Sequence, residues 1–353
     1  MKKTALTDGI AALQQGAELR AEPPFSQNAQ YPGIDLAKFI LAFFICTIHI
    51  VPFDLKGEGW DCLNFWLKNY LCRIAVPYYF AAAGFLLFRK MTPEKIDPDR
   101  IRNYCLKILR LLGTWILLLF VGSREHLWFL PAVVMAVILV SLLMRAGFRL
   151  KVIGAVVLLL YLLGLLGDSW HGLLAPLDQF PFLSKALEDY KILFSTTRNG
   201  VFFGAVYIFM GAALAFCQKR IKPIAAAIGL ILSMGALAVE VFLLRSYSRP
   251  KDYNMLVCLL PATYFLMNLT IHAGIKNKPV YKRLRIIGML VFYLQLFVDY
   301  FTGHLIQVAK KSAGLELSPV RLLITVAVTV CAAVVIERLS KRERCRWLRY
   351  LYS

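Results

Sequence analysis

Long apolar segments recur along the whole chain. Ten stretches carry few charged residues and approach the length of about 20 residues that an α-helix needs to cross a bilayer. They centre on Ile34–Phe53, Phe65–Phe88, Tyr104–Val121, Leu127–Met144, Val152–Leu166, Val201–Cys217, Ile224–Leu244, Met255–His272, Ile286–Phe301 and Val320–Ile336. A soluble protein of 353 residues does not need so many apolar runs, and 59% of these residues are hydrophobic. The sequence therefore predicts an all-α, polytopic membrane protein with about ten transmembrane helices.

Basic residues are distributed unevenly between these stretches. If the N-terminus is cytoplasmic, most lysines and arginines fall on the same side of the membrane, including the tail from Arg338 to Arg349. Positively charged loops accumulate on the cytoplasmic side, so we expect both termini in the cytoplasm. The same bias explains the formal net charge of +20. No nucleic-acid partner is predicted.

The segments form one predicted membrane domain with short flanks. Residues 1–30 have no apolar core before a cleavage site and are expected to be a mobile cytoplasmic segment. Residues 31–338 are the transmembrane domain, and residues 339–353 are a basic cytoplasmic tail that rests on anionic headgroups. The long external segment Asp168–Arg198 is typical of a lid or a surface helix. A short amphipathic helix is expected within it at Leu183–Phe194.

The first apolar segment carries three ionisable residues on one face. At about 100° per residue, His49 lies within about 20° of Lys38 around the helix axis, and Asp35 lies about 40° away on the other side. Ionisable side chains in a membrane span are costly and usually face a protein interior or a wet cavity. The pattern predicts a functional cavity beside this helix. Asp35 and Lys38, one turn apart, can also form a structural ion pair.

Motifs in several segments resemble one family of membrane enzymes. Asp35, Lys38 and His49 fill the pattern Asp-x-x-Arg/Lys, ten residues, His, which is similar to the opening helix of the acyltransferase-3 family. Further matches in the same order are Arg73-Ile-Ala-Val-Pro-Tyr-Tyr-Phe, Lys107-x-x-Arg110, His126-Leu-Trp128 and Arg198-Asn-Gly. Two positions depart from the family. Ala83 stands where serine is common, and Gln295 stands where histidine is common.

The resemblance implies transfer of an acyl group, often acetyl, from a cytoplasmic CoA thioester. The implied acceptor is a hydroxyl of a cell-envelope sugar, polysaccharide or lipid. The implied setting is the bacterial cytoplasmic membrane, with the bilayer, acyl-CoA and the acceptor as partners and no permanently bound cofactor. The acceptor's identity, acetyl versus succinyl, and a monomer versus a homodimer all stay open.

Residues that match these motifs have chemistry suited to acyl transfer. Transfer to a hydroxyl needs a base or a nucleophile, and imidazole, with an ordinary pKa of about 6.5, suits either task. Along a helix, His49 lies about 16 Å from Lys38, so a donor and an acceptor can approach from opposite sides. We therefore predict His49 as the catalytic residue, assisted by Asp35 and Lys38.

Charge and position indicate the binding residues. Lys38, Lys107 and Arg110 can hold the phosphates of CoA, although the cytoplasmic bias alone also explains Lys107 and Arg110. The predicted acceptor-binding residues are Arg73, His126, Trp128, Arg198 and Glu240. Interface anchoring is an alternative for Trp128, as is interface packing for His126. No set of His, Cys and carboxylate residues has metal-ligand spacing, so no metal is predicted.

Two other functions stay open. A polytopic exporter or transporter of a glycan or related envelope substrate can use the same polar face as a substrate path. The match to a transferase motif and the lack of an internal repeat favour the enzyme. A membrane sensor without catalysis is a third interpretation, which draws on the departures at Ala83 and Gln295.

Overall fold

The computed structural model describes residues 29–53, 55–118, 125–174, 182, 185, 189, 196–217, 221–248 and 250–352. The residues of this part form helices and connecting turns, without a β-strand. The elements are α2 (Pro32–His49), α3 (Glu58–Asn69), η1 (Leu71–Ile74), α4 (Ala75–Phe88), α5 (Pro98–Leu118), η2 (Glu125–Trp128), α6 (Phe129–Arg145), α7 (Leu150–Leu166), η4 (Gly200–Gly204), α9 (Ala205–Phe216), α10 (Pro223–Tyr247), α11 (Leu259–Ile271), α12 (Pro279–Ala313), η5 (Ser318–Val320), α13 (Arg321–Leu339) and η6 (Glu343–Leu351).

A helix occupies each of the ten apolar stretches, which confirms the prediction of an all-α protein. Within the described residues, five helical segments are long and apolar enough to cross a bilayer. These are Pro32–His49, Glu58–Phe88, Pro223–Tyr247, Pro279–Ala313 and Ser318–Leu339. The full set of ten spans and the cytoplasmic termini stay predictions. Residues 1–28 and most of the predicted helix Leu183–Phe194 lie outside the described residues.

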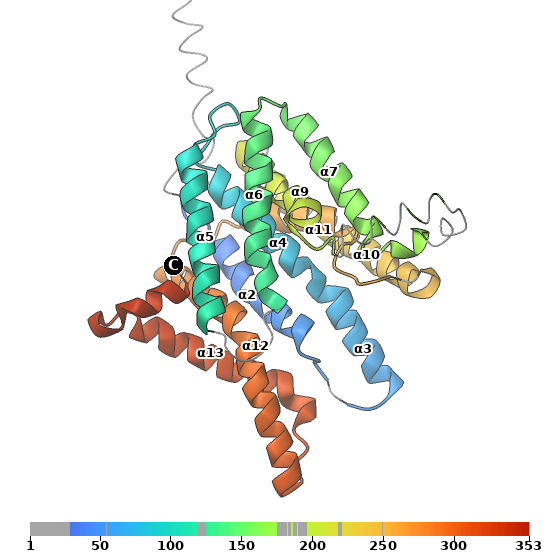
Figure 1. Ribbon diagram of the computed structural model, residues 1–353, viewed down its shortest axis with the longest axis vertical. Coiled ribbons are helices and arrows are strands. Elements are labelled where there is room, and N and C mark those ends of the chain that lie inside the picture. The colour runs from blue at the N-terminus through green and yellow to red at the C-terminus, as the bar shows by residue number, and fades with distance from the viewer. Residues whose placement is uncertain are drawn as a thin grey trace, which may run out of the picture.

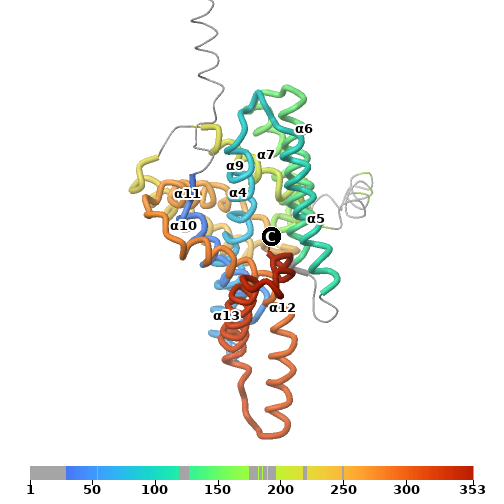
Figure 2. The backbone as a smooth tube through the Cα atoms, turned by 90° about the vertical axis from the view of Figure 1, so that its left-hand side faces the viewer, coloured from blue at the N-terminus to red at the C-terminus, as the bar shows by residue number. Residues whose placement is uncertain are grey.

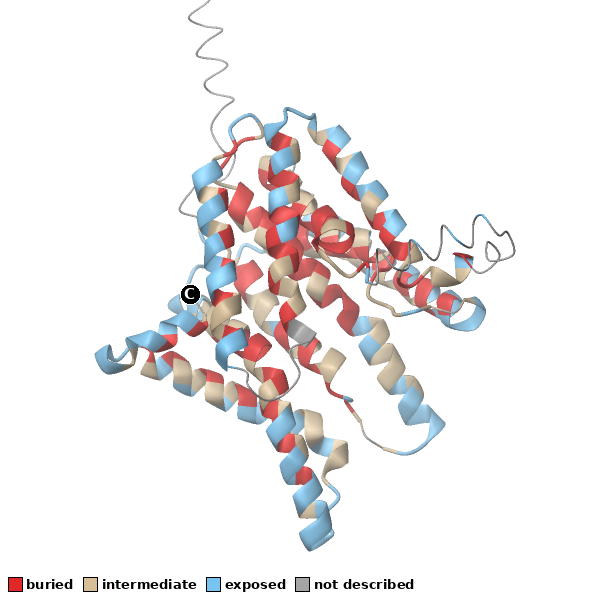
Figure 3. Ribbon diagram, viewed as in Figure 1, coloured by how far each residue is buried: buried red, intermediate tan, exposed pale blue. Residues whose placement is uncertain are grey.

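Helix α4 lies at the centre of the bundle (Figure 1). It packs against α9, α11, α2 and α6, and nearly all of its residues are buried. A helix that is apolar on every side requires such a position. Figure 3 shows the buried residues gathered where α2, α4 and α9 meet, whereas α3 has none.

The second predicted span, Phe65–Phe88, is not one regular helix. A 3₁₀ turn, η1, separates α3 from α4 and carries Arg73. Pro77, near the middle of the predicted span, lies in the first turn of α4. Proline is tolerated there because the first turn of a helix needs no hydrogen bond from its backbone nitrogen. The irregular turn of this span therefore precedes Pro77.

The C-terminal helices form a hairpin that extends away from the rest of the bundle (Figure 2). Asp299 of α12 accepts two hydrogen bonds from the guanidinium of Arg321 in α13, at 2.9 and 2.7 Å. Thr302 and Thr325 join the same two helices through their hydroxyls at 2.7 Å. The carboxylate of Asp299 thus joins α12 to α13 within the hairpin.

The basic tail folds back onto the bundle. Its 3₁₀ segment η6 buries Leu348 and Leu351. The indole nitrogen of Trp115 in α5 donates a hydrogen bond to the carbonyl of Leu351 at 3.1 Å. Tyr352, the next residue, lies close enough to Ser340 for a hydroxyl hydrogen bond of 2.8 Å. Contacts with α5 and the end of α13 therefore hold the tail in addition to any headgroup contact.

Glycines bring α4 and α9 close together. A methyl group on Gly84 would collide with the carbonyl oxygen of Ile208, and one on Gly211 would collide with the carbonyl oxygen of Ala81. Small residues of this kind allow membrane helices to approach at backbone distance. The α4–α9 contact therefore depends on two residues without side chains.

The change Gly84→Ala is expected to lower the free energy of unfolding by about 1–3 kcal/mol, because the new methyl forces backbone apart. Thermal unfolding of the purified protein in detergent measures the loss. Gly113→Ala in α5 is the matched control, since a methyl there meets no atom within 4 Å. Equal unfolding temperatures for the two variants would contradict the packing argument.

Candidate functional site

Helix α2 connects two separate cavities. Lys38, near its start, lines one, and His49, its last residue, lines the other. The eleven residues between them correspond to about 16 Å along the helix axis. The two cavities share no lining residue in the described part of the chain. We call them the Lys38 cavity and the His49 cavity.

The Lys38 cavity has a volume of about 250 Å³ and mostly apolar walls. Its lining residues are Lys38, Tyr79, Ala83, Tyr104, Lys107, Ile108, Leu111, Phe129, Leu130, Val133, Met289, Phe292, Tyr293 and Tyr352. The hydroxyl of Tyr79 donates to the carbonyl of Lys38 at 2.6 Å, and the Lys38 ammonium lies 5.7 Å from the centre of the Tyr79 ring. Aromatic contacts therefore fix the lysine at the cavity wall.

The structure separates the two basic residues predicted to bind the donor together with Lys38. Lys107 lines the Lys38 cavity. Arg110, three residues further along α5, is exposed and is not part of the lining. Tyr352 of the tail reaches the same cavity and was not predicted, because only the folded-back tail brings it there.

Asp35 has a different partner from the one expected. Its carboxylate lies 3.6 Å from the guanidinium of Arg285 in α12, and it forms no ion pair with Lys38. Asp35 is buried, and a buried carboxylate needs a cation or hydrogen-bond donors nearby. The arginine sits on another helix, so the sequence spacing alone favoured the wrong pair. Asp35 is absent from the linings of both cavities.

The His49 cavity is small, about 40 Å³, and carries several polar side chains. Its lining residues are Ile45, Ile48, His49, Arg73, Val76, Trp128, Arg198, Phe203 and Asn254. The structure thus brings His49 together with Arg73, Trp128 and Arg198, three residues predicted to bind the acceptor. Asn254, which comes from the loop before α11, was not predicted.

Arg198 stands directly before the helical segment formed by η4 and α9. The Asn199 side chain accepts hydrogen bonds from the backbone nitrogens of Val201 and Phe202 at 2.9 and 3.0 Å, which starts this segment. Gly200 packs directly on α6, where a methyl group would collide with Ala132. This contact places the Arg198 guanidinium 5.1 Å from the centre of the Trp128 ring, a cation–π distance.

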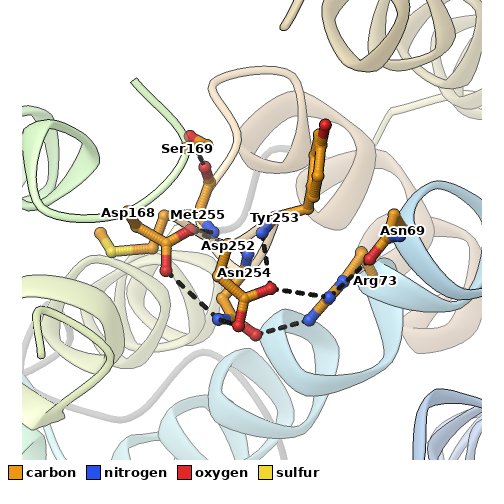
Figure 4. Close-up of polar contacts among 8 residues, drawn as sticks. All are labelled: Asn69, Arg73, Asp168, Ser169, Asp252, Tyr253, Asn254 and Met255. Carbon is orange, nitrogen blue, oxygen red and sulfur yellow. Dashed lines mark hydrogen bonds and ion pairs between the residues drawn. The ribbon is translucent and has the colours of Figure 1, made fainter. Parts of the chain in front are cut away.

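Arg73 is buried at the centre of a polar cluster (Figure 4). Its guanidinium donates to Asn69 at 2.7 Å, to Asp252 at 3.1 Å and to Asn254 at 2.5 Å. Asn254 in turn donates to Asp252 at 2.6 Å and to Asp168 at 3.2 Å. Such a network satisfies most of a charge that the apolar interior would otherwise penalise.

The pKa values of the two loop carboxylates in this cluster, Asp168 and Asp252, are shifted in opposite directions. Burial raises the pKa of Asp168, and hydrogen bonds from Met255 and Asn254 only partly offset it. Burial also raises the pKa of Asp252, but the Arg73 guanidinium and the hydrogen bonds from Tyr253 and Asn254 together outweigh it, so this pKa lies below its ordinary value. Asp252 is therefore the anion that balances Arg73.

Of the remaining predicted acceptor residues, Glu240 lies elsewhere. Glu240 is buried outside the linings of both cavities. Its carboxylate accepts hydrogen bonds from the backbone nitrogens of Val257 and Cys258, each at 2.8 Å, and from the indole of Trp170 at 3.1 Å. It thus holds the start of α11. His126 belongs to η2, and its side chain lies outside what the structure describes.

The change Glu240→Gln is expected to lower the free energy of unfolding by about 1–3 kcal/mol, because an amide nitrogen would face a backbone N–H. Thermal unfolding in detergent measures this loss. Binding of the acceptor by the molecules that remain folded should be unchanged. A variant of normal stability that lost acceptor binding would assign Glu240 to the binding site instead.

Comparisons with known proteins identify a family that matches most of this chain. A family model described as an acyltransferase domain matches residues 31–338. An amino-acid racemase of Enterococcus faecalis is 29% identical over 273 residues, which cover 70% of this chain and 37% of that protein. A serine/alanine racemase of Enterococcus gallinarum is 25% identical over 349 residues, covering 90% of this chain and 47% of that protein. The chain spans less than half the length of these relatives. No solved structure gives a significant match.

Proposed function

Because the chain belongs to the acyltransferase family whose model matches residues 31–338, we propose that it is a membrane-embedded O-acyltransferase. It would move an acyl group, most simply acetyl, from cytoplasmic acyl-CoA to a hydroxyl of an acceptor at the cell envelope. One observation carries this proposal: α2 presents a lysine to one cavity and a histidine to another. The apolar helices and the family both support a place in a membrane.

The Lys38 cavity suits the donor. Its volume of about 250 Å³ and its aromatic walls fit an acyl chain and its thioester arm. Lys38 and Lys107 supply ammonium groups that match the phosphates of CoA. With a cytoplasmic N-terminus, the start of α2 and this cavity face the compartment that contains acyl-CoA.

The acyl group has to travel along α2 from Lys38 towards His49. Ala42 and Cys46 lie on the same face of the helix between the two residues, and both are fully buried. Their side chains are small, but full burial means that packed neighbours cover this face. Entry of the thioester arm therefore requires those neighbours to move.

His49 would carry out the proton transfer. In direct transfer, its imidazole accepts the proton of the acceptor hydroxyl as that oxygen bonds to the thioester carbon. The carbon–sulfur bond breaks, and the CoA thiolate takes the proton. In a two-step route the imidazole nitrogen itself holds the acyl group before the hydroxyl attacks. Both routes consume one acyl-CoA and release one CoA.

The change His49→Ala is expected to reduce the rate of acyl transfer by at least about 100-fold, because no base or nucleophile replaces the imidazole. Release of CoA and acylation of the acceptor by purified protein in nanodiscs measure the rate. His304→Ala, at an exposed site of α12, is the control. Full activity of a folded His49→Ala variant would remove His49 from the mechanism.

Lys107→Gln is expected to raise the KM for acyl-CoA about three- to tenfold, because one phosphate contact is lost at a partly solvated site. Arg110→Gln, on the same helix but outside the cavity, should leave the KM unchanged. Steady-state kinetics with varied acyl-CoA give both values. An equal effect of the two changes would indicate a general charge effect.

A transporter is the alternative proposal. Two cavities at the ends of one helix, without a shared lining residue, also suit a carrier that opens to one side at a time. The racemase names of the relatives add a small amino acid as a candidate substrate. Movement of labelled serine or glycan across proteoliposomes without use of acyl-CoA would favour the transporter.

A further inference from the structure

The His49 cavity has the size of one small polar group. Its volume of about 40 Å³ holds about three waters, since each needs about 10–15 Å³ measured in this way. A carboxylate group has three heavy atoms and fits this space.

The charge of this cavity is positive. Two guanidiniums, of Arg73 and Arg198, line it, and none of its described lining residues is acidic. Asp252 balances Arg73 at 3.1 Å. Arg198 forms no ion pair with a described residue, and its guanidinium lies on the Trp128 ring instead. The two nearby carboxylates, Asp252 and Asp168, lie outside the lining, so the described lining carries two cations and no anion.

One buried hydrogen-bond donor at this site is left without an acceptor. Arg73 is 6% exposed, and its Nε has no hydrogen-bond partner within the described part of the chain, although both of its terminal nitrogens are bonded. An unsatisfied buried donor is costly and rare. Arg73 lines the cavity, so an anion bound to Arg198 there would lie beside this guanidinium, and a small turn of the side chain would give Nε its missing acceptor.

The arginines are held in place before any ligand arrives. Asn69, Asp252 and Asn254 fix the plane of Arg73. Stacking on Trp128 limits the freedom of Arg198. Fixed donors lose little side-chain entropy when a ligand binds, which favours affinity and orientation.

We propose that the His49 cavity is a carboxylate subsite in which Arg198 and the Nε of Arg73 bind the acid group of the acceptor. This inference rests on the proposed function and narrows its acceptor to a hydroxy acid, either a hydroxyamino acid or a sugar acid. With its carboxylate held there, the acceptor presents a hydroxyl beside His49. The proton of that hydroxyl passes to the imidazole as the ester bond forms, and the thioester bond breaks.

Binding of acids and their neutral counterparts, without acyl-CoA, tests the subsite. Equilibrium titration of the purified full chain uses D-glycerate against glycerol and D-glucuronate against D-glucose. At least one acid should bind saturably and at least about tenfold more tightly than its neutral counterpart, because only the acid fills the subsite. Inorganic phosphate should bind more weakly than that acid, because it lacks the rest of the acceptor.

Arg198→Gln should weaken binding of that acid at least about tenfold, while Arg198→Lys should retain part of it, because the charge remains but the planar fork is lost. Arg245→Gln is the matched control. Arg245 also lies over an aromatic ring, 4.2 Å from the centre of Phe65, but it is exposed and outside the cavity. Thermal unfolding confirms that each variant is folded.

The outcomes separate this inference from the proposed function. Binding of neither acid, equal binding of the neutral counterparts, tighter binding of phosphate, or full affinity in Arg198→Gln would each overturn the carboxylate subsite. Acyl transfer to a neutral sugar at a rate that Arg198→Gln leaves unchanged would overturn the subsite, while the transferase proposal would stand. Binding of an acid that depends on Arg198, without acyl transfer, would support the subsite and reject the transferase.

Discussion

The cost of placing charge inside an apolar bundle organises this protein. Each buried carboxylate or guanidinium has partners that come from another helix or loop. Arg73 binds Asp252 and two asparagines, Asp35 pairs with Arg285, and Glu240 holds backbone N–H groups at the start of α11. These contacts also fix the helices relative to one another, so the polar groups define the fold as well as the sites.

Two cations differ from this pattern. Lys38 and Arg198 lie on cavities and on aromatic rings, and neither forms an ion pair within the described residues. A charge that has a structural role in an apolar interior is neutralised by other groups of the protein. A charge that faces a cavity can be neutralised by a ligand of opposite charge. The proposed binding sites both follow from this difference: the phosphates of the donor bind at Lys38, and the carboxylate of the acceptor binds at Arg198.

The sequence predicted elements that depend on local pattern. Apolar length found the helices, and the spacing of Lys38 and His49 indicated one cavity beside α2, whereas the structure gives each residue a cavity of its own. The sequence did not predict contacts between residues that are far apart along the chain. Nothing near Asp35 indicates Arg285, and the apolar flanks of Glu240 gave no sign that its ligands are backbone nitrogens. Asn254 and Tyr352 reach the cavities only after a loop and the tail have folded.

The residues of the proposed chemistry and those of the proposed acceptor subsite belong to different elements of this fold. His49 and Lys38 belong to α2, a rigid helix packed along α12. Arg198 and Trp128 come from the starts of two other helical segments, which Gly200 holds in contact. Changes around Arg198 can therefore alter which acid binds without moving the imidazole. Such a division would let one reaction serve different acceptors. The residues that bind the acceptor can change at the start of a helical segment while α2 stays the same.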